Sequence, residues 1–166
     1  MNTTITYAAQ SRIATPLGPL TAVATEHGLS GLWFDAQSHH PGVLDAPIDD
    51  QHPLLMQTRD ELAEYWRGER AVFTLPLDLH GTPFQRAVWA ALLAIAHGRT
   101  STYGEIAARA GSPAAVRAAG AAIGRNPVSI VVPCHRVIGR DGSLTGYAAG
   151  IPRKQALLQL EGVLLT

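Results

Sequence analysis

The sequence predicts a mixed α/β fold of the α+β kind, in which a small antiparallel sheet precedes a mainly helical part. Residues 3–35 consist of short β-branched or alternating runs separated by proline and glycine, which is the pattern of an antiparallel meander. Residues 82–123 instead carry apolar side chains at helical spacing between capping signals. We therefore expect a sheet with one or two helices first and a helical domain second.

Charge divides the chain at the same place. The 166 residues have a formal net charge of zero, yet residues 1–80 hold four Lys or Arg and ten Asp or Glu, whereas residues 81–166 hold nine and three. We place an amino-terminal domain at 1–80 and a second domain at 81–166. The basic second half favours a polyanionic partner, because phosphate contacts use Lys and Arg. Chance clustering on solvated faces is the alternative.

Composition excludes several classes of protein. With 46% hydrophobic residues the chain can bury a substantial core. Its longest apolar run, residues 87–96, is about half of what a membrane span needs, so we expect no membrane association. A single cysteine excludes an internal disulfide framework, and the sequence does not start like a signal peptide, so a cytoplasmic location is expected. Histidines 39, 40 and 52 show no repeated ligand spacing, and we expect no metal site.

The amino-terminal half is predicted to hold strands at 3–5, 20–24 and 32–34, followed by an amphipathic helix over 53–67. Residues 72–77 can form one more strand, at the sheet edge because of Pro76. The aromatic residues of the helix are expected in the core. This half carries no recognisable chemistry.

The second half opens with a helix that Thr82 and Gln85 start as a capping box and Gly98 ends. Thr102 and Glu105 make another capping box, for a helix of two turns that stops at Gly111. A third helix is expected over residues 112–123. Two short helices joined by a tight glycine turn resemble a helix-turn-helix. The buried stripe of the first helix consists of Phe84, Val88, Leu92 and Ile95.

Alanine and glycine dominate the third helix, and Arg117 is its one long polar side chain. A helix that reads the major groove normally presents several base-reading side chains, which this helix lacks. A helix of small residues can approach DNA closely, and its one long side chain can then insert between bases, which favours binding in the minor groove with Arg117 as a wedge. Tight packing against another helix is the alternative interpretation.

The only cysteine, Cys134, lies in the apolar run 130–139, between Pro133 and His135. Most free cysteines are small buried hydrophobes. Here an adjacent imidazole and the guanidinium of Arg136 can activate the thiol, which favours a nucleophile. We expect Pro133 to end a strand at 129–132 and to leave Cys134 at the strand end.

The rest of the chain reads as a turn at 139–143, a small-residue loop at 144–150 suited to lining a pocket, and a helix that starts at Pro152. Glu161, near the end of this helix, follows an apolar run. An inward role beside His135 is possible, although a solvated carboxylate is the ordinary interpretation.

The run Pro133-Cys134-His135-Arg136-Val137-Ile138-Gly139 closely resembles the signature of the O6-alkylguanine-DNA alkyltransferases. The resemblance extends to Asn126-Pro127, Tyr103-Gly104 and Arg117. It is strong over residues 81–162, whereas residues 1–80 resemble the family's amino-terminal domain only in layout. The resemblance implies minor-groove binding through a helix-turn-helix, extrusion of the damaged guanine and irreversible transfer of its alkyl group to cysteine. Double-stranded DNA containing O6-alkylguanine would be the partner of a monomer, with possible cooperative assembly on DNA and no cofactor.

Site roles are carried over from the family by position. Cys134 would accept the alkyl group, His135 would deprotonate it through a water, Glu161 would orient His135, and Asn126 would brace the site. Tyr103 would bind the leaving guanine and Arg117 would fill the vacated stack. Further substrate contacts are expected from Tyr147, Ala148 and Val137, and further DNA contacts from Ser112, Ala115 and Gly120. Arg136 would be a structural or electrostatic support.

The sequence departs from the family pattern at three places: Ala149 replaces a frequent glycine, Ala156 a frequent tryptophan and Ala96 a frequent proline. Ala149 puts the room and backbone freedom of the pocket in question. Since the amino-terminal half has no cysteine, the zinc site of some relatives is not expected.

Three other functions make different predictions. A lesion-sensing alkyltransferase-like protein would lack the acceptor cysteine, which is present here. A helix-turn-helix regulator with a structural cysteine would need base-reading side chains on the third helix. A cysteine hydrolase would turn over repeatedly.

Overall fold

The computed structural model describes residues 4–163, which form two compact units. One unit contains the described residues up to Asp35 together with His40–Leu79. The other contains Ala36–His39 and the described residues from His80 onward. Four residues of the amino-terminal half thus belong to the second unit.

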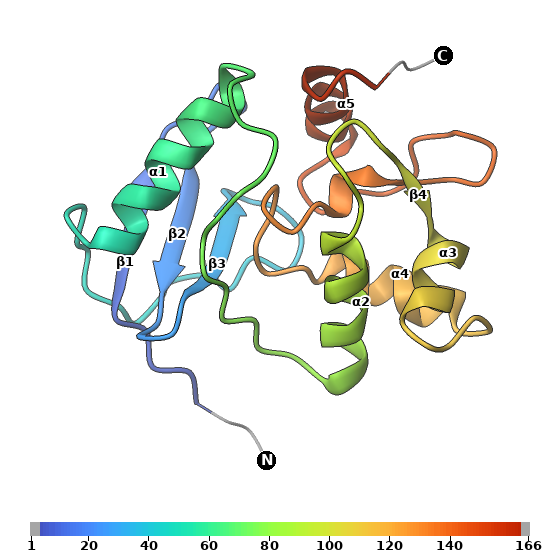
Figure 1. The fold of residues 1–166 in the computed structure, drawn as a ribbon. Helices are drawn as coiled ribbons and strands as arrows, with labels where there is room; N and C mark the ends of the chain where they lie inside the picture. The colour runs from blue at the N-terminus through green and yellow to red at the C-terminus, as the bar shows by residue number, and fades with distance from the viewer. Residues whose placement is uncertain (1–3, 164–166) are drawn as a thin grey trace. The chain divides into compact units, whose positions relative to one another are not determined.

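The first unit is a three-stranded antiparallel sheet and one helix (Figure 1). Strands β1 (Ala9–Ile13), β2 (Leu20–Ala24) and β3 (Leu29–Phe34) pair in chain order, as the meander pattern predicts. Helix α1 (Pro53–Trp66) lies along one face of this sheet and matches the predicted helix. Every residue of β2 is buried, because β2 is the central strand.

Two predicted strands of this unit are wrong. The first strand lies at Ala9–Ile13 instead of 3–5: residues 4 and 5 are not in a strand, and residue 3 lies outside the described part of the chain. Residues 72–77 form only a single bridge to β3, in which Leu29 N donates to Pro76 O and Asp78 N donates to Leu29 O. Pro76 has no N–H to continue a ladder, so the pairing stops there.

The second unit is mainly helical. Its helices are α2 (Pro83–Leu93), α3 (Tyr103–Arg109), α4 (Val116–Gly124) and α5 (Ile151–Leu160). A short parallel pair, β4 (Ser101–Thr102) with β5 (Val137–Ile138), fixes the start of α3 beside the residues that follow Cys134. No helix in the described part of the chain has the length and apolarity to span a bilayer.

The capping signals of this unit hold in part. Thr82 and Gln85 form the predicted capping box of α2. Thr102 caps α3 by accepting from the backbone N–H of Glu105, but the Glu105 carboxylate accepts from Ser101 Oγ instead of closing the box. The hydroxyl of Ser101, a residue of β4, thus donates to Glu105 in place of the backbone N–H of Thr102 that a capping box would use.

Two further predictions of the second unit are wrong. Helix α4 begins at Val116, after a turn in which Ala115 N donates to Ser112 O. Residues 129–132 form a turn instead of a strand, with Ile130 at φ 73°. The Asn126 side chain holds this turn, because its Nδ2 donates to Val132 O and its Oδ1 accepts from Val128 N.

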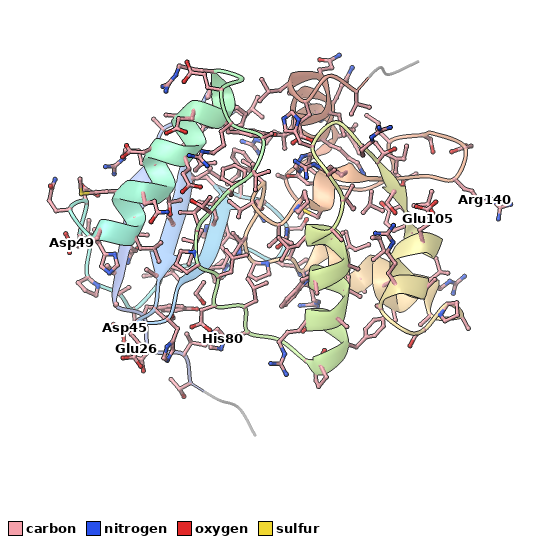
Figure 2. The ribbon with its side chains drawn as sticks, in the orientation of Figure 1. Glu26, Asp45, Asp49, His80, Glu105 and Arg140 are labelled. Atoms are coloured by element: carbon pink, nitrogen blue, oxygen red, sulfur yellow. The ribbon has the colours of Figure 1, made fainter. Side chains whose placement is uncertain are left out.

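Charged side chains of the first unit project from its loops, as Glu26, Asp45 and Asp49 show in Figure 2. In the second unit, Arg140 projects outward from the turn after β5. Two of the second unit's cations, Arg136 and Lys154, are instead buried. Both buried cations belong to the site around Cys134, which is described next.

Candidate active site

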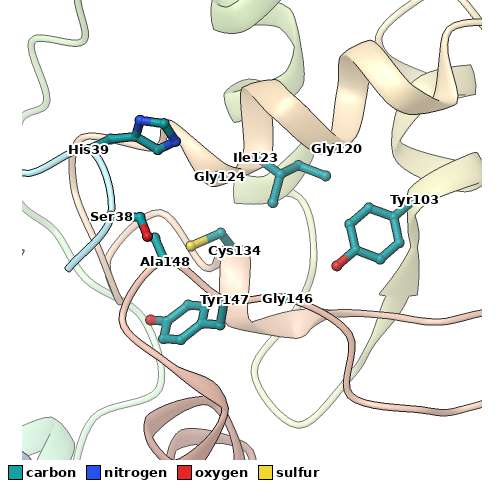
Figure 3. Close-up of a pocket in the computed structure, with 10 residues that line it drawn as sticks. All are labelled: Ser38, His39, Tyr103, Gly120, Ile123, Gly124, Cys134, Gly146, Tyr147 and Ala148. Carbon is teal, nitrogen blue, oxygen red and sulfur yellow. The ribbon is translucent and has the colours of Figure 1, made fainter.

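A cavity of about 340 Å³ opens in the second unit, large enough for a ligand of nucleobase size (Figure 3). Its walls come from α4, from the start of α3, from the loop before α5 and from the segment 36–39. Cys134 supplies the thiol of the cavity. The lining residues are Ser38, His39, Tyr103, Gly120, Ile123, Gly124, Cys134, Gly146, Tyr147 and Ala148.

Cys134 is the first residue of a short 3-10 helix, η1 (Cys134–Arg136), and only 5% of its surface is exposed. Its thiol points toward the side of the cavity where Ser38 and Ala148 lie (Figure 3). Asn126 Nδ2 lies 3.2 Å from Sγ, within hydrogen-bonding distance. The residue that shapes the turn before the cysteine therefore also contacts its sulfur.

Burial raises the pKa of the Cys134 thiol. The hydrogen bond from Asn126 and the positive charge of Lys154 act in the opposite direction but do not overcome burial. The resting protein therefore holds a neutral thiol at neutral pH. Reaction at this sulfur requires a base that removes its proton.

His135, completely buried, follows the cysteine and pairs with Glu161. The two side chains meet at 2.8 Å, between His135 Nε2 and Glu161 Oε2. Glu161 is the C-cap residue of α5 and is itself buried, so its carboxylate faces inward. The inward role that the sequence left open for Glu161 is the one that the structure has.

The same carboxylate also binds Arg136. Arg136 Nε donates to Glu161 Oε1 at 2.7 Å and Nη2 donates to Oε2 at 3.0 Å, a bidentate pair. Nη1 donates to the carbonyl of Ile95 at 2.6 Å. Arg136 thus joins the end of α5 to the segment after α2 and compensates the buried negative charge.

The pairing with Glu161 fixes which nitrogen of His135 carries the proton. A carboxylate accepts, so Nε2 bears the hydrogen and Nδ1 keeps its lone pair. Within residues 4–163, His135 Nδ1 has no hydrogen-bonding partner. Burial lowers the pKa of His135, although Glu161 opposes this, so the imidazole is neutral at neutral pH. A neutral ring with a free lone pair can accept a proton.

Lys154, which the sequence analysis did not single out, is also buried in the site. Its ammonium donates to the carbonyls of Val137, Thr145 and Gly146. Burial lowers the pKa of Lys154 to about 8; the charge of Cys134, when its thiol is ionised, acts in the opposite direction. A sequence signal exists: Lys154 shares the inward stripe of α5 with Leu157, Leu158 and Glu161.

Tyr103 lies across the cavity from the thiol and is hydrogen-bonded to the loop before α5 (Figure 3). Tyr103 Oη donates to Thr145 O at 2.9 Å and accepts from Thr145 Oγ1 at 3.2 Å. Tyr147 and Ala148 line the cavity below and beside the thiol (Figure 3). Ala149 has no positive φ, so alanine in place of glycine strains no backbone there, while Gly150 does take a φ of 96°.

The other predicted site residues lie apart from the thiol. Val137 is fully buried in β5 and does not line the cavity. Gly120 lines it, and a methyl group there would meet Tyr103 at 3.7 Å. Arg117 is exposed on the first turn of α4, while Ser112 and Ala115 are half-buried in the turn before that helix.

Two cavity residues come from the amino-terminal half, where the sequence showed no chemistry. Ser38 and His39 line the cavity beside the thiol. No local sequence pattern predicts that these two residues line a cavity, since they lie in a polar stretch after a strand. Only the three-dimensional structure brings them to Cys134.

Within residues 4–163 there is no group of three or more His, Cys, Asp or Glu side chains that can hold a metal ion. The buried carboxylate of Glu161 is occupied by His135 and Arg136. The arrangement therefore offers a nucleophile, a base and buried cations from the chain's own side chains.

Two family models together match most of the chain. The model described as 6-O-methylguanine DNA methyltransferase, DNA binding domain, matches residues 83–163. The model described as 6-O-methylguanine DNA methyltransferase, ribonuclease-like domain, matches residues 8–79.

Individual proteins are similar over nearly their whole length. Methylated-DNA–protein-cysteine methyltransferase of Mycobacterium tuberculosis is 47% identical over 149 residues, covering 90% of this chain and 89% of that protein. The protein of the same name from Salmonella typhimurium is 47% identical over 165 residues, covering 94% and 96%. The crystal structure of Mycobacterium tuberculosis OGT in complex with DNA has a TM-score of 0.87 at 45% identity, covering 93% of this chain and 92% of that one.

Proposed function

Because this chain belongs to the methylated-DNA–protein-cysteine methyltransferase family, we propose that it repairs DNA by moving the alkyl group of O6-alkylguanine onto its own Cys134. The observation that carries the proposal is the thiol of Cys134 in a nucleobase-sized cavity, followed directly by a neutral His135 held by Glu161. A nucleophile, a base and an orienting carboxylate are the parts that thiol alkylation needs.

The reaction begins with deprotonation of Cys134. His135 Nδ1 takes the thiol proton through a water, while Glu161 stabilises the imidazolium that forms. Asn126 donates to the thiolate, and the ammonium of Lys154 lowers the cost of its negative charge. Arg136 keeps Glu161 ionised and in place.

The thiolate then displaces guanine from the alkyl carbon. The new bond joins Sγ to that carbon, and the bond from the carbon to O6 of guanine breaks with its electron pair. The base takes up one proton and leaves as neutral guanine: Tyr103 hydrogen-bonds the base and supplies this proton, and the imidazolium of His135 gives the thiol proton to solvent, which restores the Tyr103 hydroxyl. No cofactor enters this balance, and the thioether has no route back to a thiol, so each molecule acts once.

Residues 81–166 form the DNA-binding and alkyl-acceptor domain in this proposal. Helices α3 and α4 act as the helix-turn-helix, which enters the minor groove of double-stranded DNA, and Arg117 fills the space of the extruded base. Ala115 and Gly120 allow close approach of α4. Ser112 meets a phosphate from the turn before α4, since the helix itself begins four residues later.

The remaining proposals concern the setting of the reaction. The acceptor thiol has to stay reduced, which fits a cytoplasmic protein. One chain carries all the groups of the site, so the proposal needs only a monomer, with cooperative assembly on DNA as an additional possibility. Val137 supports the site through its carbonyl, which accepts from Lys154.

Intact-mass measurement tests the proposal. The protein is incubated with a duplex containing O6-methylguanine, and its mass is compared with that of a Cys134→Ser variant. We expect the gain of one methyl group per molecule in the native protein and none in the variant. An unchanged mass despite binding of the lesion would show a sensor of damage rather than a repair protein.

A further inference from the structure

The segment Ala36–His39 forms a cavity wall that the proposed chemistry does not use. It belongs to the second unit although it lies in the amino-terminal half of the chain. Ser38 N donates to Ala148 O at 2.9 Å. Ser129 Oγ donates to Gln37 Oε1 at 3.3 Å. The segment is therefore attached both to the loop before α5 and to the turn before Cys134.

The backbone of this segment is unusual. In the described part of the chain, only three residues other than glycine have a positive φ, and two of them are Ala36 at 59° and His39 at 64°. Non-glycine residues in this region cost about 1 kcal/mol or more and persist where the surroundings fix them. Here the two anchoring hydrogen bonds fix the segment, and the left-handed turn at its end places His39 on the cavity.

The direction of attack assigns this wall to the alkyl group. In a displacement at carbon, the attacking sulfur, the carbon and the leaving oxygen lie roughly in line, so the other substituents of the carbon project sideways from this line, next to the sulfur. Figure 3 shows Ser38, His39 and Ala148 on the side of Cys134 toward which its thiol points, and Tyr103 across the cavity. The base belongs near Tyr103, and a long alkyl chain extends toward Ser38 and His39.

We propose that Ser38 and His39 limit the size of the alkyl group that can reach Cys134. The inference rests on the proposed function, because it assigns a specificity role at the same site. Ser38 is small and bounds the cavity next to the thiol, and the exposed imidazole of His39 lines the cavity on the same side. A methyl group fits under both side chains, whereas a benzyl group meets the ring of His39.

The test compares single-turnover rates on two duplexes, one with O6-methylguanine and one with O6-benzylguanine. His39→Gly removes the ring and keeps the positive φ that the position requires. We expect it to raise the ratio of benzyl to methyl rate about 10-fold, the lower end of what a pocket contact gives in discrimination. Ser38→Leu fills the same space and is expected to lower that ratio by about 10-fold.

His40→Gly is the matched control, since His40 is the next residue along the chain and its ring lies 6.0 Å from that of Trp33 instead of lining the cavity. Its ratio is expected to equal that of the native protein. An unchanged ratio in both His39→Gly and Ser38→Leu, with methyl transfer intact, overturns the size limit. Absence of methyl transfer in the native protein overturns the proposed function instead.

Discussion

Glu161 is the residue on which the buried charges of the site depend. It is the only acidic side chain that contacts His135 and Arg136 among the described residues, and all three are buried. Glu161→Gln leaves the guanidinium of Arg136 without its counter-charge, and loss of one partner of a buried ion pair is strongly destabilising. We expect a loss of about 3 kcal/mol in the free energy of unfolding, measured by urea denaturation.

Glu105→Gln is the control for this change. Glu105 is exposed, and its carboxylate accepts from Ser101 Oγ at 2.7 Å, so its neutralisation is expected to cost less than about 1 kcal/mol. Equal losses in the two variants would contradict the central position of Glu161 in the buried network.

Lys154 predicts a pH dependence of stability. Its pKa is about 8 in the folded protein, against an ordinary value of 10.5. Between these values the unfolded chain holds a proton that the folded chain has released, so raising the pH favours the folded state. We compare the free energies of unfolding of the native protein and of Lys154→Met. The native value minus the variant value is therefore expected to rise by up to about 3 kcal/mol across this window.

Urea denaturation at a series of pH values measures this difference, which is expected to be flat below pH 8. Arg153→Met replaces the arginine that precedes Lys154 in the chain and provides the comparison. A difference that stays flat or falls with pH across the same window would mean that burial does not lower the pKa of Lys154.

At the scale of elements, α4 carries the proposed contact with the DNA stack. Arg117 is exposed on its first turn, outside the cavity that holds Cys134. Arg117→Ala is expected to slow repair of O6-methylguanine in duplex DNA by at least about 10-fold, because the extruded base loses its replacement in the stack. Reaction with free O6-benzylguanine needs no extrusion and meets the same His39 wall in the native protein and the variant, so it measures the cavity alone and is expected to change little. Equal losses on the two substrates would reject the wedge.

Local sequence patterns predicted the elements that local interactions determine. The capping box of α2 and the glycine turn after α3 are examples, since both depend on residues a few positions apart. The strand expected at 129–132 was wrong because Asn126, through its side chain, supplies the hydrogen bonds that a neighbouring strand would have supplied. An apolar run alone does not distinguish a buried strand from a buried turn.

The site shows the same limit. Cys134, His135 and Asn126 stand out in the sequence by their chemistry and their resemblance to a known signature. The contact between Glu161 and His135 spans 26 positions, and only the packing of α5 shows it. Ser38 and His39 are farther still, and nothing in their neighbourhood in the sequence indicates a cavity.

At the scale of the whole molecule, the charge excess of the second unit is smaller on its surface than in its sequence. Lys154 and Arg136 are buried, so the cations available to a partner are fewer than the sequence suggests. Among the described residues 81–163 the exposed arginines are Arg86, Arg99, Arg109, Arg117, Arg125 and Arg140, and the exposed acidic residues are Glu105 and Asp141. The accessible surface of this unit remains basic.

This surface predicts a salt dependence of binding to undamaged duplex DNA. If about four phosphates are neutralised, the affinity is expected to fall roughly 100-fold between 50 and 200 mM salt, because bound counterions are released on association. Fluorescence anisotropy at several salt concentrations measures the slope. An affinity that does not change with salt would contradict a phosphate-binding role for the second unit.

The central claim is that Cys134 receives the alkyl group, once. It is tested most directly with an excess of duplex carrying O6-methylguanine with a deuterated methyl group, followed by peptide mapping and a count of repaired DNA. We predict one labelled methyl group per protein molecule, on the peptide that contains Cys134, and one repaired lesion for each. Label on another residue, or more repaired lesions than protein molecules, would contradict the account.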